Sequence, residues 1–274
     1  LIWNYNPYVS KLLSSWDMHF RVHHATEIYL VREPLFSHTN FEEDYLRMSM
    51  HLRKTFQYID LVIPVSSGVI ETINSFFDYK GEVLPLFNGC DDKFWINPKI
   101  YQKTSATTSI KNKNKKNSLS NRKQKTIFYQ GAINDRLDYI LLNYVASELP
   151  NWRFVFCGQK NGIEQNIEAN NFFSKPNVEY LGNLAPEKIR KEAGDSDVAI
   201  IPFRDAYILR KSLPLKAYEY VACGLPVVTT MVDDLCNKED IFHVVMNKEK
   251  FVEAIRKSAK PRYNEKFLEK RLLE

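Results

Sequence analysis

The chain has 274 residues, with 44% hydrophobic and 26% charged side chains, a composition typical of globular proteins and a length that suits two domains. It has neither an apolar stretch of about eighteen residues nor a basic leader followed by an apolar segment, so we expect no membrane-spanning helix and no signal peptide. Its four cysteines form no CxxC pair, which argues against a zinc site and a disulfide framework and favours a cytoplasmic location.

The net charge of +5 comes from one short basic segment. Seven lysines and arginines lie between residues 111 and 125 without a single acid among them, so the rest of the chain is mildly acidic. A nucleic-acid-binding face would combine basic with exposed aromatic side chains, whereas this segment holds asparagine and serine. We therefore expect a solvated linker and no nucleic-acid partner, with contact to an anionic membrane surface as the minor alternative.

Apolar runs alternate with helical patterns along the whole chain, which predicts an α/β protein with parallel sheets. In the first part we expect strands at Leu1–Asn4, His19–His23, Leu61–Val65 and Val83–Phe87. Helices are expected near Pro7–Ser15, Phe41–Ile59 and Ser67–Phe77. This partial Rossmann-like domain would occupy residues 1–97, and residues 98–125 would form the linker because they hold too few apolar side chains to order themselves.

Residues 126–274 contain six predicted strands with five helices between them, enough for one complete Rossmann-like domain. The strands are expected at Thr126–Gln130, Arg153–Cys157, Val178–Leu181, Val198–Pro202, Pro226–Thr230 and Phe242–Met246. The helices are expected near Asp135–Glu148, Gly162–Phe173, Pro186–Ala193, Pro214–Cys223 and Lys248–Ala259.

The most informative run extends from Leu213 to Thr230 and is predicted to form a helix, a glycine stop and a buried strand. Pro214 suits the first helical turn, and Gly224 suits the left-handed residue that ends a helix. One face of this helix is expected to pack against the domain, and it holds Leu215, Tyr218 and Ala222. Another face is expected to be free for a ligand, and it holds Lys216, Glu219 and Tyr220 at spacings of three and four residues.

This run resembles the donor-site signature of the retaining glycosyltransferases of family 4, the group 1 transferases, which carry a helix of the type L-K-x-x-E-Y-x-A-x-G-x-P-V-V. The resemblance implies a GT-B architecture, in which two Rossmann-like domains face each other across the substrates. It also implies that Glu219 accepts hydrogen bonds from the ribose hydroxyls of a sugar nucleotide, a task that suits the two oxygens of a carboxylate. The alternative is that Lys216 and Glu219 form a surface ion pair of little consequence.

A glycine follows the first predicted strand of the second domain. Gly131 and the next residue, Ala132, would let backbone N–H groups and the positive end of a helix approach a diphosphate. In many family 4 enzymes this loop also supplies an arginine and a lysine that neutralise the leaving diphosphate. Arg136 fits the first role, but Asp138 stands near the place of the lysine, so Lys216 is the candidate for the second. The other candidate cations are Arg204, Arg210 and Lys211.

Other parts of the chain match the family in some places and depart from it in others. Many family members carry a second glutamate seven residues before the ribose ligand, and this chain has Lys211 there, which indicates a divergent branch. The segments Val62–Ser67 and Leu84–Asp91 resemble the strand ending in serine and the Asn-Gly turn at the family's domain crossover. The strand and glycine-rich loop that open the family's first domain are not found, so we expect that domain to be incomplete in this chain.

Two more groups of polar residues call for an interpretation. His24 follows a predicted strand where relatives often have a histidine or aspartate facing the transferred sugar, and it is the candidate for a hydrogen bond to that sugar, with Glu27 second. The alternative is that both merely finish a strand. Asp195 and Asp197 have the spacing of a metal-binding DxD motif, but capping and turn formation explain them better, so we expect no metal.

These observations predict a glycosyltransferase that moves a sugar from a nucleoside-diphosphate sugar to a glycan or lipid-linked acceptor, with retention implied by the family. Its predicted catalytic residues are His24, Glu27, Arg136 and Lys216. Its predicted donor-binding residues are Gly131, Ala132, Arg136, Lys216, Glu219, Tyr220 and Gly224. We expect no cofactor besides the co-substrate, and a cytoplasmic protein that contacts the inner face of the membrane peripherally if at all. The alternatives are a catalytically idle nucleotide-sugar-binding module and a GT-B-shaped sugar-nucleotide epimerase.

Overall fold

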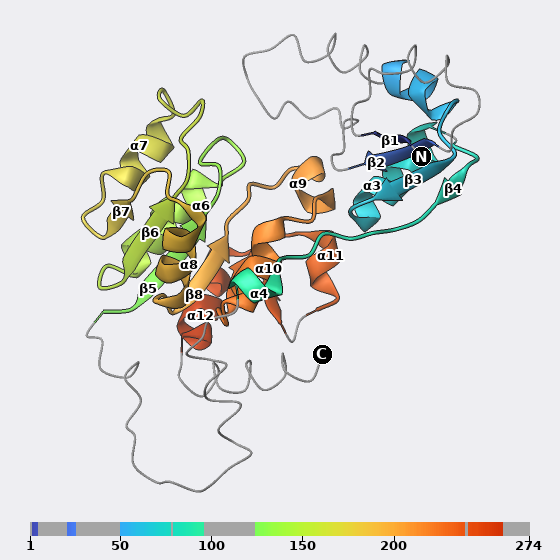
Figure 1. The fold of residues 1–274 in the computed structure, drawn as a ribbon. Coiled ribbons are helices and arrows are strands. Elements are labelled where there is room, and N and C mark those ends of the chain that lie inside the picture. Colours follow the sequence, from blue (N-terminus) through green and yellow to red (C-terminus); the bar gives the residue numbers. More distant parts are fainter. Residues whose placement is uncertain are drawn as a thin grey trace, which may run out of the picture. The chain divides into compact units, whose positions relative to one another are not determined.

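The computed structural model describes residues 2–4, 21–25, 50–77, 79–95, 124–238 and 241–259, and it divides the chain into two compact units (Figure 1). The first unit comprises Leu1–Asn88, Asp205–Leu213 and Val232–Asn237. The second comprises Gly89–Arg204, Pro214–Met231 and Lys238–Glu274. Two short segments that follow strands of the second unit along the chain therefore belong to the first unit.

The second unit is built on a six-stranded parallel sheet. Its strands are β5 (Thr126–Gln130), β6 (Arg153–Cys157), β7 (Val178–Tyr180), β8 (Val198–Ile201), β9 (Val227–Thr229) and β10 (Phe242–Val244). They lie in the order β10-β9-β8-β5-β6-β7, and every adjacent pair is parallel. This is the doubly wound order of a Rossmann fold, with the strand order reversing between β5 and β8.

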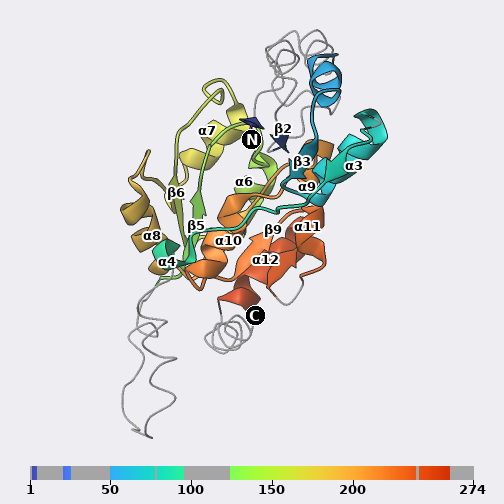
Figure 2. The same ribbon diagram turned by 45° about the vertical axis from the view of Figure 1, so that its right-hand side comes forward.

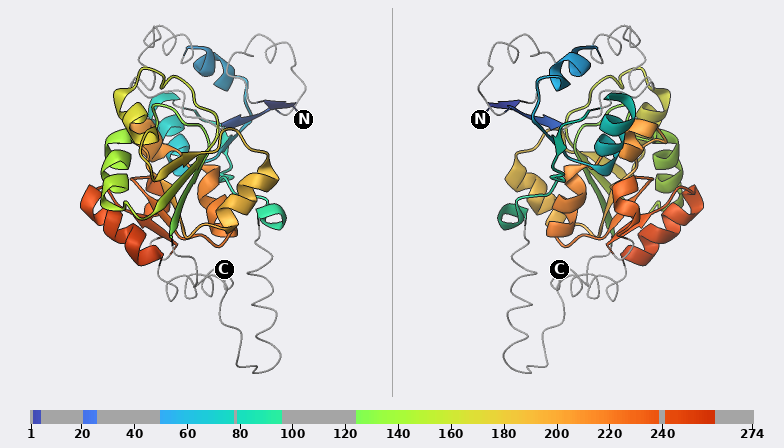
Figure 3. Two further views of the ribbon diagram at one scale, coloured as in Figure 1. Left: turned by 90° about the vertical axis from the view of Figure 1, so that its left-hand side faces the viewer. Right: turned by 90° about the vertical axis from the view of Figure 1, so that its right-hand side faces the viewer.

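Helices cover both faces of this sheet (Figure 3). On one face lie α6 (Tyr139–Glu148), α7 (Ile167–Phe173) and α12 (Lys248–Ser258). On the other face lie α8 (Pro186–Gly194), α10 (Leu215–Ala222) and the short α4 (Asp92–Trp95). Strands buried on both faces need near-continuous apolar sequence, and Val198, Ala199, Ile200 and Ile201 of β8 are all fully buried.

Two helices of the second unit begin later than the sequence predicted. The side chain of Asp138 caps α6 by accepting the Leu141 N–H, so residues 131–138 form a loop instead of the predicted first turn of the helix. In the same way Asn166 caps α7 by accepting the Ala169 N–H. A carboxylate or amide oxygen that satisfies a free N–H group stabilises a helix start, and this decides where each helix begins.

The first unit contains a four-stranded parallel sheet in the order β1-β2-β3-β4. Its strands are β1 (Ile2–Asn4), β2 (Arg21–Ala25), β3 (Leu61–Pro64) and β4 (Glu82–Val83). The predicted strand Val83–Phe87 is wrong beyond its first residue, although Leu84 and Leu86 still donate backbone N–H groups to Val62 and Pro64. Pro85 has no N–H group of its own to offer, and regular pairing ends there.

Helix α3 (Ser67–Thr72) follows β3 and continues into a π-helical turn, η1 (Ile73–Phe77). Two helices that the sequence did not predict, α9 (Tyr207–Lys211) and α11 (Asp233–Cys236), pack against α3 (Figure 2). Within the described ranges, no helix is both long and apolar enough to cross a membrane.

Several predictions fall on residues whose placement is not described. The linker lies outside the described residues as far as residue 123, and so do the predicted helix Pro7–Ser15 and Glu27. The predicted helix Phe41–Ile59 is described only from residue 50, and it is helical at residues 50–56.

Candidate functional site

The carboxyl ends of β5 and β8 flank the point where the strand order reverses, which is the edge where open α/β sheets bind ligands. Polar groups from two segments meet at the end of β5. The end of β5 and its loop supply Tyr129, Gln130 and Gly131, and helix α10 supplies Lys216 and Glu219. These five residues are named the edge cluster.

Glycine is required at the ends of two neighbouring strands. Gly131 has a φ of +123°, and a Cβ atom there would lie 2.5 Å from Lys216 Nζ. Gly158, after β6, has a φ of +134°, and its Cβ would lie 1.9 Å from the carbonyl oxygen of Gly131. The Gly131 N–H also donates to the Cys157 carbonyl at 3.0 Å. The two loops therefore touch backbone to backbone. Because Gly131 has no side chain, Lys216 Nζ can lie directly beside its main chain.

The ammonium group of Lys216 has an incomplete set of partners. Its Nζ donates to the hydroxyl of Tyr129 at 2.9 Å and lies 4.3 Å from the centre of the same ring. No carboxylate among the described residues forms an ion pair with it. Burial lowers the pKa of Lys216 to about 7; Glu219 opposes this shift, and the positive charge of Arg136 adds to it. An anionic ligand here would supply the negative charge that the fold does not.

Glu219 is partly buried and accepts a hydrogen bond at Oε2 from the Nε2 of Gln130. Burial raises the pKa of Glu219, while Lys216 and the Gln130 hydrogen bond lower it. In the part of the chain that is described, Oε1 has no hydrogen-bond partner, and Glu219 forms no ion pair with Lys216. The alternative of a surface ion pair between these two residues is therefore wrong, and both side chains keep bonding capacity for a ligand.

The expectation about the two faces of α10 is partly wrong. Tyr220 is fully buried, and its hydroxyl accepts the N–H of Gln130 at 2.8 Å, so it packs beneath β5 and does not share the free face. Leu215, predicted to pack, is 51% exposed. The buried residues Ala217 and Tyr220 are spaced by three, so the helix is rotated relative to the prediction because the Tyr220 hydroxyl finds its partner on the β5 backbone.

The remaining predicted donor residues surround the edge cluster or hold α10 in place. Arg136 is exposed in the loop before α6, and its carbonyl accepts the N–H of Arg204. Ala132 is exposed, and its carbonyl accepts the Tyr129 hydroxyl at 2.9 Å. Gly224 has a φ of +78° and ends α10, so helix termination already explains a glycine there. Their roles in binding stay predictions.

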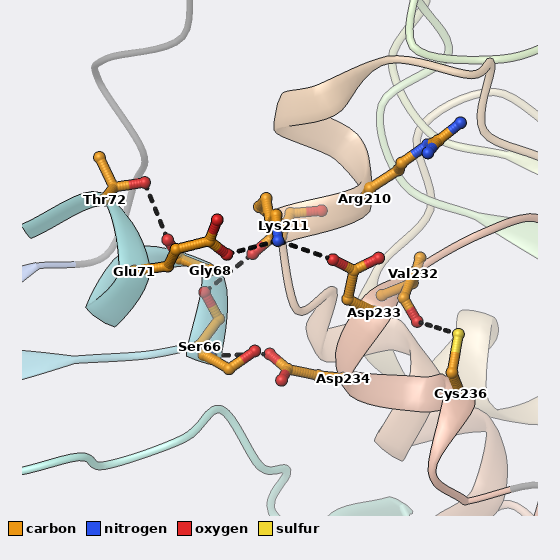
Figure 4. Close-up of polar contacts among 12 residues, drawn as sticks. Ser66, Gly68, Glu71, Thr72, Arg210, Lys211, Val232, Asp233, Asp234 and Cys236 are labelled. Atoms are coloured by element: carbon orange, nitrogen blue, oxygen red, sulfur yellow. Dashed lines mark hydrogen bonds and ion pairs between the residues drawn. The ribbon is translucent and has the colours of Figure 1, made fainter. Parts of the chain in front are cut away.

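Further candidates belong to the first unit. His24 lies in β2 of the first unit. Of the alternative cations, Lys211 pairs with Glu71 at 2.5 Å and with Asp233 at 3.0 Å (Figure 4). Arg210 bonds Asp205 through two nitrogens at 2.6 and 2.7 Å. Both are occupied by carboxylates of the first unit, so Lys216 is a better candidate for phosphate than either of them.

Asp197 has a structural role at the opposite edge of the sheet. At the start of β8, it accepts the Lys125 ammonium at 2.9 Å and the Thr126 N–H at 2.8 Å. These contacts tie the amino ends of β5 and β8 together, far along both strands from the edge cluster. Over the described ranges, no three His, Cys, Asp or Glu side chains lie close enough together to hold a metal ion.

A comparison with protein families decides the identity of this fold. The family model described as "Glycosyl transferases group 1" matches residues 124–260, half of the chain. The chain belongs to the group 1 glycosyltransferases. Among relatives, TuaH of Bacillus subtilis (strain 168), named as a glycosyltransferase of teichuronic acid biosynthesis, is 27% identical over 100 residues. That match covers 36% of this chain and 25% of TuaH.

Solved structures show that this glycosyltransferase has the GT-B fold that the sequence predicted. A sucrose-phosphate synthase from Thermosynechococcus elongatus gives a TM-score of 0.71 at 14% identity, over 97% of this chain and 66% of that one. WaaG, a glycosyltransferase involved in lipopolysaccharide biosynthesis, gives 0.66 at 15% identity, over 96% and 75%. HepE of Anabaena in complex with UDP-glucose gives 0.60 at 15% identity, over 94% and 69%. At these identities the likeness concerns the fold.

Sequence reasoning missed Tyr129 and Gln130, each of which forms a side-chain hydrogen bond with one residue of α10. The available signal was a tyrosine and a glutamine at the end of an otherwise apolar strand, immediately before the glycine. Their partners on α10 lie 87 and 89 residues away in the sequence, so only the order of strands in the sheet brings them together.

Proposed function

We propose that this group 1 glycosyltransferase moves a sugar from a nucleoside-diphosphate sugar to a glycan or lipid-linked acceptor, with retention of the anomeric configuration. The observation that carries the proposal is the meeting of Lys216, Glu219 and the Gly131 loop where the strand order reverses. One helix carries, three residues apart, a lysine that has no carboxylate partner and a carboxylate that has one oxygen free, as far as the described residues go. They match the two polar ends of a nucleoside diphosphate.

The chemistry assigns a part of the donor to each group. Glu219 would accept the ribose hydroxyls, because a carboxylate binds neighbouring hydroxyls with charge-assisted hydrogen bonds. Lys216 and the Gly131 backbone would bind the diphosphate, with exposed Arg136 as a second cation. Charge develops on the diphosphate as the bond to the sugar breaks, so a cation fixed beside it would stabilise the transition state. His24 and Glu27 stay the candidates for contact with the transferred sugar.

The names of the relatives support a sugar nucleotide as donor and a glycan as acceptor. HepE is described in complex with UDP-glucose, and the name of TuaH refers to teichuronic acid biosynthesis. A uridine donor is therefore the first to test. If the acceptor is lipid-linked, the enzyme would work at a membrane surface, where the basic segment at residues 111–125 would be attracted to anionic lipids.

Titration calorimetry with a panel of UDP-, GDP- and ADP-sugars tests the donor site. We expect one nucleotide class to bind the wild-type chain, and Glu219→Ala to weaken that binding by about 1–3 kcal/mol because a charge-assisted hydrogen bond is lost. Asp197→Asn is the matched control, since it changes a carboxylate at the opposite edge of the same sheet. The absence of any binding, or equal affinity in Glu219→Ala, would contradict the proposal.

Product analysis separates the proposed transferase from its alternatives. Transfer requires release of the nucleoside diphosphate that depends on an added acceptor, and NMR of the new linkage reports retention or inversion. Binding without release would instead indicate an idle nucleotide-sugar-binding module. Conversion of the sugar nucleotide into an epimer without release would indicate an epimerase. We expect transfer to continue in the presence of EDTA.

A further inference from the structure

Two consecutive residues at the end of β5 each contact one of the two ligand-facing side chains of α10. Tyr129 contacts Lys216 through a hydrogen bond of 2.9 Å, and Gln130 donates its side-chain amide to Glu219. The backbone of Gln130 is itself fixed to the same helix, because its N–H donates to the buried Tyr220 hydroxyl. The strand end and the helix are therefore joined at three adjacent points.

The bond between Gln130 and Glu219 determines which carboxylate oxygen is left for a ligand. Only the NH₂ group of Gln130 can face Glu219 Oε2, because its carbonyl oxygen would place two acceptors against each other. Elsewhere among the described residues neither the second N–H nor the carbonyl of this amide has a partner. The pair thus presents one carboxylate oxygen beside one amide donor and one amide acceptor, a set that matches two neighbouring hydroxyls.

The bond between Tyr129 and Lys216 holds the ammonium beside Gly131. Tyr129 is 1% exposed as a residue, and its ring stacks on Phe156 with centroids 5.1 Å apart, so the ring is held in place. Its hydroxyl proton is directed at the Ala132 carbonyl, 2.9 Å away, which leaves an oxygen lone pair for Lys216. A flexible lysine side chain is thereby kept in one position at the glycine loop.

We propose that Gln130 and Tyr129 are positioning residues of the donor site, Gln130 orienting Glu219 for the ribose and Tyr129 orienting Lys216 for the diphosphate. The inference rests on the proposed function, since it assumes that this site binds a sugar nucleotide. Each residue acts through one partner, so the two parts of the ligand are recognised separately. Loss of the Gln130 side chain should lower the preference for ribose over deoxyribose. Loss of the Tyr129 hydroxyl should lower the preference for a diphosphate over a monophosphate.

Binding preferences measured by calorimetry test this division. The probes are whichever of UDP, GDP and ADP binds the wild-type chain most tightly, its 2′-deoxy counterpart and the matching nucleoside monophosphate. In Gln130→Leu we expect the preference for ribose over deoxyribose to fall about tenfold, with the preference for diphosphate over monophosphate retained. In Tyr129→Phe, which keeps the ring, we expect the reverse: the diphosphate preference falls about fivefold and the ribose preference is retained.

A second variant keeps the test independent of folding. Gln130→Glu has almost the same shape but places a second carboxylate beside Glu219, so we expect weak binding at neutral pH and recovery as acidification protonates one of the two. A merely structural role for Gln130 would not produce this recovery. Wild-type Gln130 should show no such gain over the same pH range.

The outcomes separate the inference from the proposed function. If the wild-type chain binds no nucleotide, the proposed function fails. If it binds, and Glu219→Ala loses the ribose preference while Gln130→Leu keeps it, only the role of Gln130 fails. Equal effects of Gln130→Leu and Tyr129→Phe on both preferences would overturn the division into two subsites.

Discussion

Lys211 and Lys216 lie five residues apart, yet the first unit and the second unit give them opposite surroundings. Lys211, at the end of α9, contacts carboxylates of α3 and α11, and its hydrogen bonds to Glu71 and Asp233 raise its pKa (Figure 4). Lys216 donates to a phenol oxygen and lies near the rings of Tyr129 and Phe203, and burial lowers its pKa. One lysine is paired with two carboxylates, and the other has no carboxylate partner in the part of the chain that is described.

The backbone around Lys211 is equally well bonded. The Ser66 hydroxyl donates to the Lys211 carbonyl at 2.9 Å, and the Ser67 N–H donates to Asp234 at 3.0 Å. Gly68 allows this close approach, since a Cβ there would lie 2.5 Å from the Lys211 carbonyl oxygen. These contacts hold α9 and α11 on α3. Lys211 thus serves packing within the first unit, through its carbonyl and its two ion pairs.

Gly158→Ala should have the largest effect on stability, because Gly158 packs directly against the backbone of Gly131 in the edge cluster. The new Cβ would meet the Gly131 carbonyl oxygen at 1.9 Å, in a conformation with a φ of +134°. We expect the free energy of unfolding to fall by about 3 kcal/mol or more in chemical denaturation. Gly162→Ala is the matched control, since Gly162 also has a positive φ but open space around it, and it should cost about 1–2 kcal/mol. Equal losses would show that the backbone contact matters little.

Lys216→Met should separate binding from stability. Removal of the cation beside Gly131 should weaken the binding of a nucleoside diphosphate by about 2 kcal/mol, because a charge-assisted contact is lost. The free energy of unfolding should not fall, since the fold no longer has to bury an ammonium group whose hydrogen-bond partner is one phenol oxygen. Calorimetry and denaturation on the same sample measure both. A large loss of stability with unchanged affinity would show that Lys216, like Lys211, serves the fold and not the ligand.

Lys211→Met should show the opposite pattern to Lys216→Met. Two carboxylates would lose their common cation, so we expect about 1 kcal/mol less stability, a modest value because Glu71 is half exposed. Nucleotide affinity should stay at the wild-type value. Arg210→Met tests the assignment further, because its pair with Asp205 is more exposed and should matter less. An affinity loss in Lys211→Met comparable to that of Lys216→Met would show that both lysines serve the ligand.

The pH dependence of nucleoside-diphosphate binding should show whether the protonated form of Lys216 is the one that binds. Its pKa of about 7 in the free protein means that binding an anion at higher pH requires uptake of a proton. Affinity should therefore be level below pH 7 and fall by up to about tenfold per pH unit above it, until the pKa of the complex is reached. Lys216→Arg should abolish the dependence, since arginine keeps its charge. A level profile in the wild-type chain would contradict the lowered pKa.

Lys216 should also affect stability with a defined sign. Between about pH 7 and pH 10 the unfolded chain keeps a proton that the folded chain has released, so the contribution of this group to the free energy of unfolding rises with pH. Lys211 behaves in the other direction, since its contribution is present below the pKa of the unfolded state and is lost as pH rises through its raised folded pKa.

The central strands of the second unit were predicted almost residue by residue, because a strand buried on both faces must be a nearly continuous apolar run. Thr126–Gln130 and Arg153–Cys157 have the predicted bounds. The short helices α4, α9 and α11 were not predicted, since four or five residues carry too little periodicity and are held by tertiary contacts. Caps at Asp138 and Asn166 likewise decided helix starts that composition alone had placed too early.

The sequence by itself placed Lys216 and Glu219 three residues apart on one helix that Gly224 ends, although it wrongly put Tyr220 on the same free face. That information is local, since helical geometry relates neighbours along the chain. Only the tertiary structure decided that Tyr129 and Gln130 meet these residues, because strand order brings the end of β5 beside α10. It also decided that Lys211 is paired with carboxylates and stays protonated, whereas burial lowers the pKa of Lys216, since the charge state of a lysine depends on what surrounds it in space.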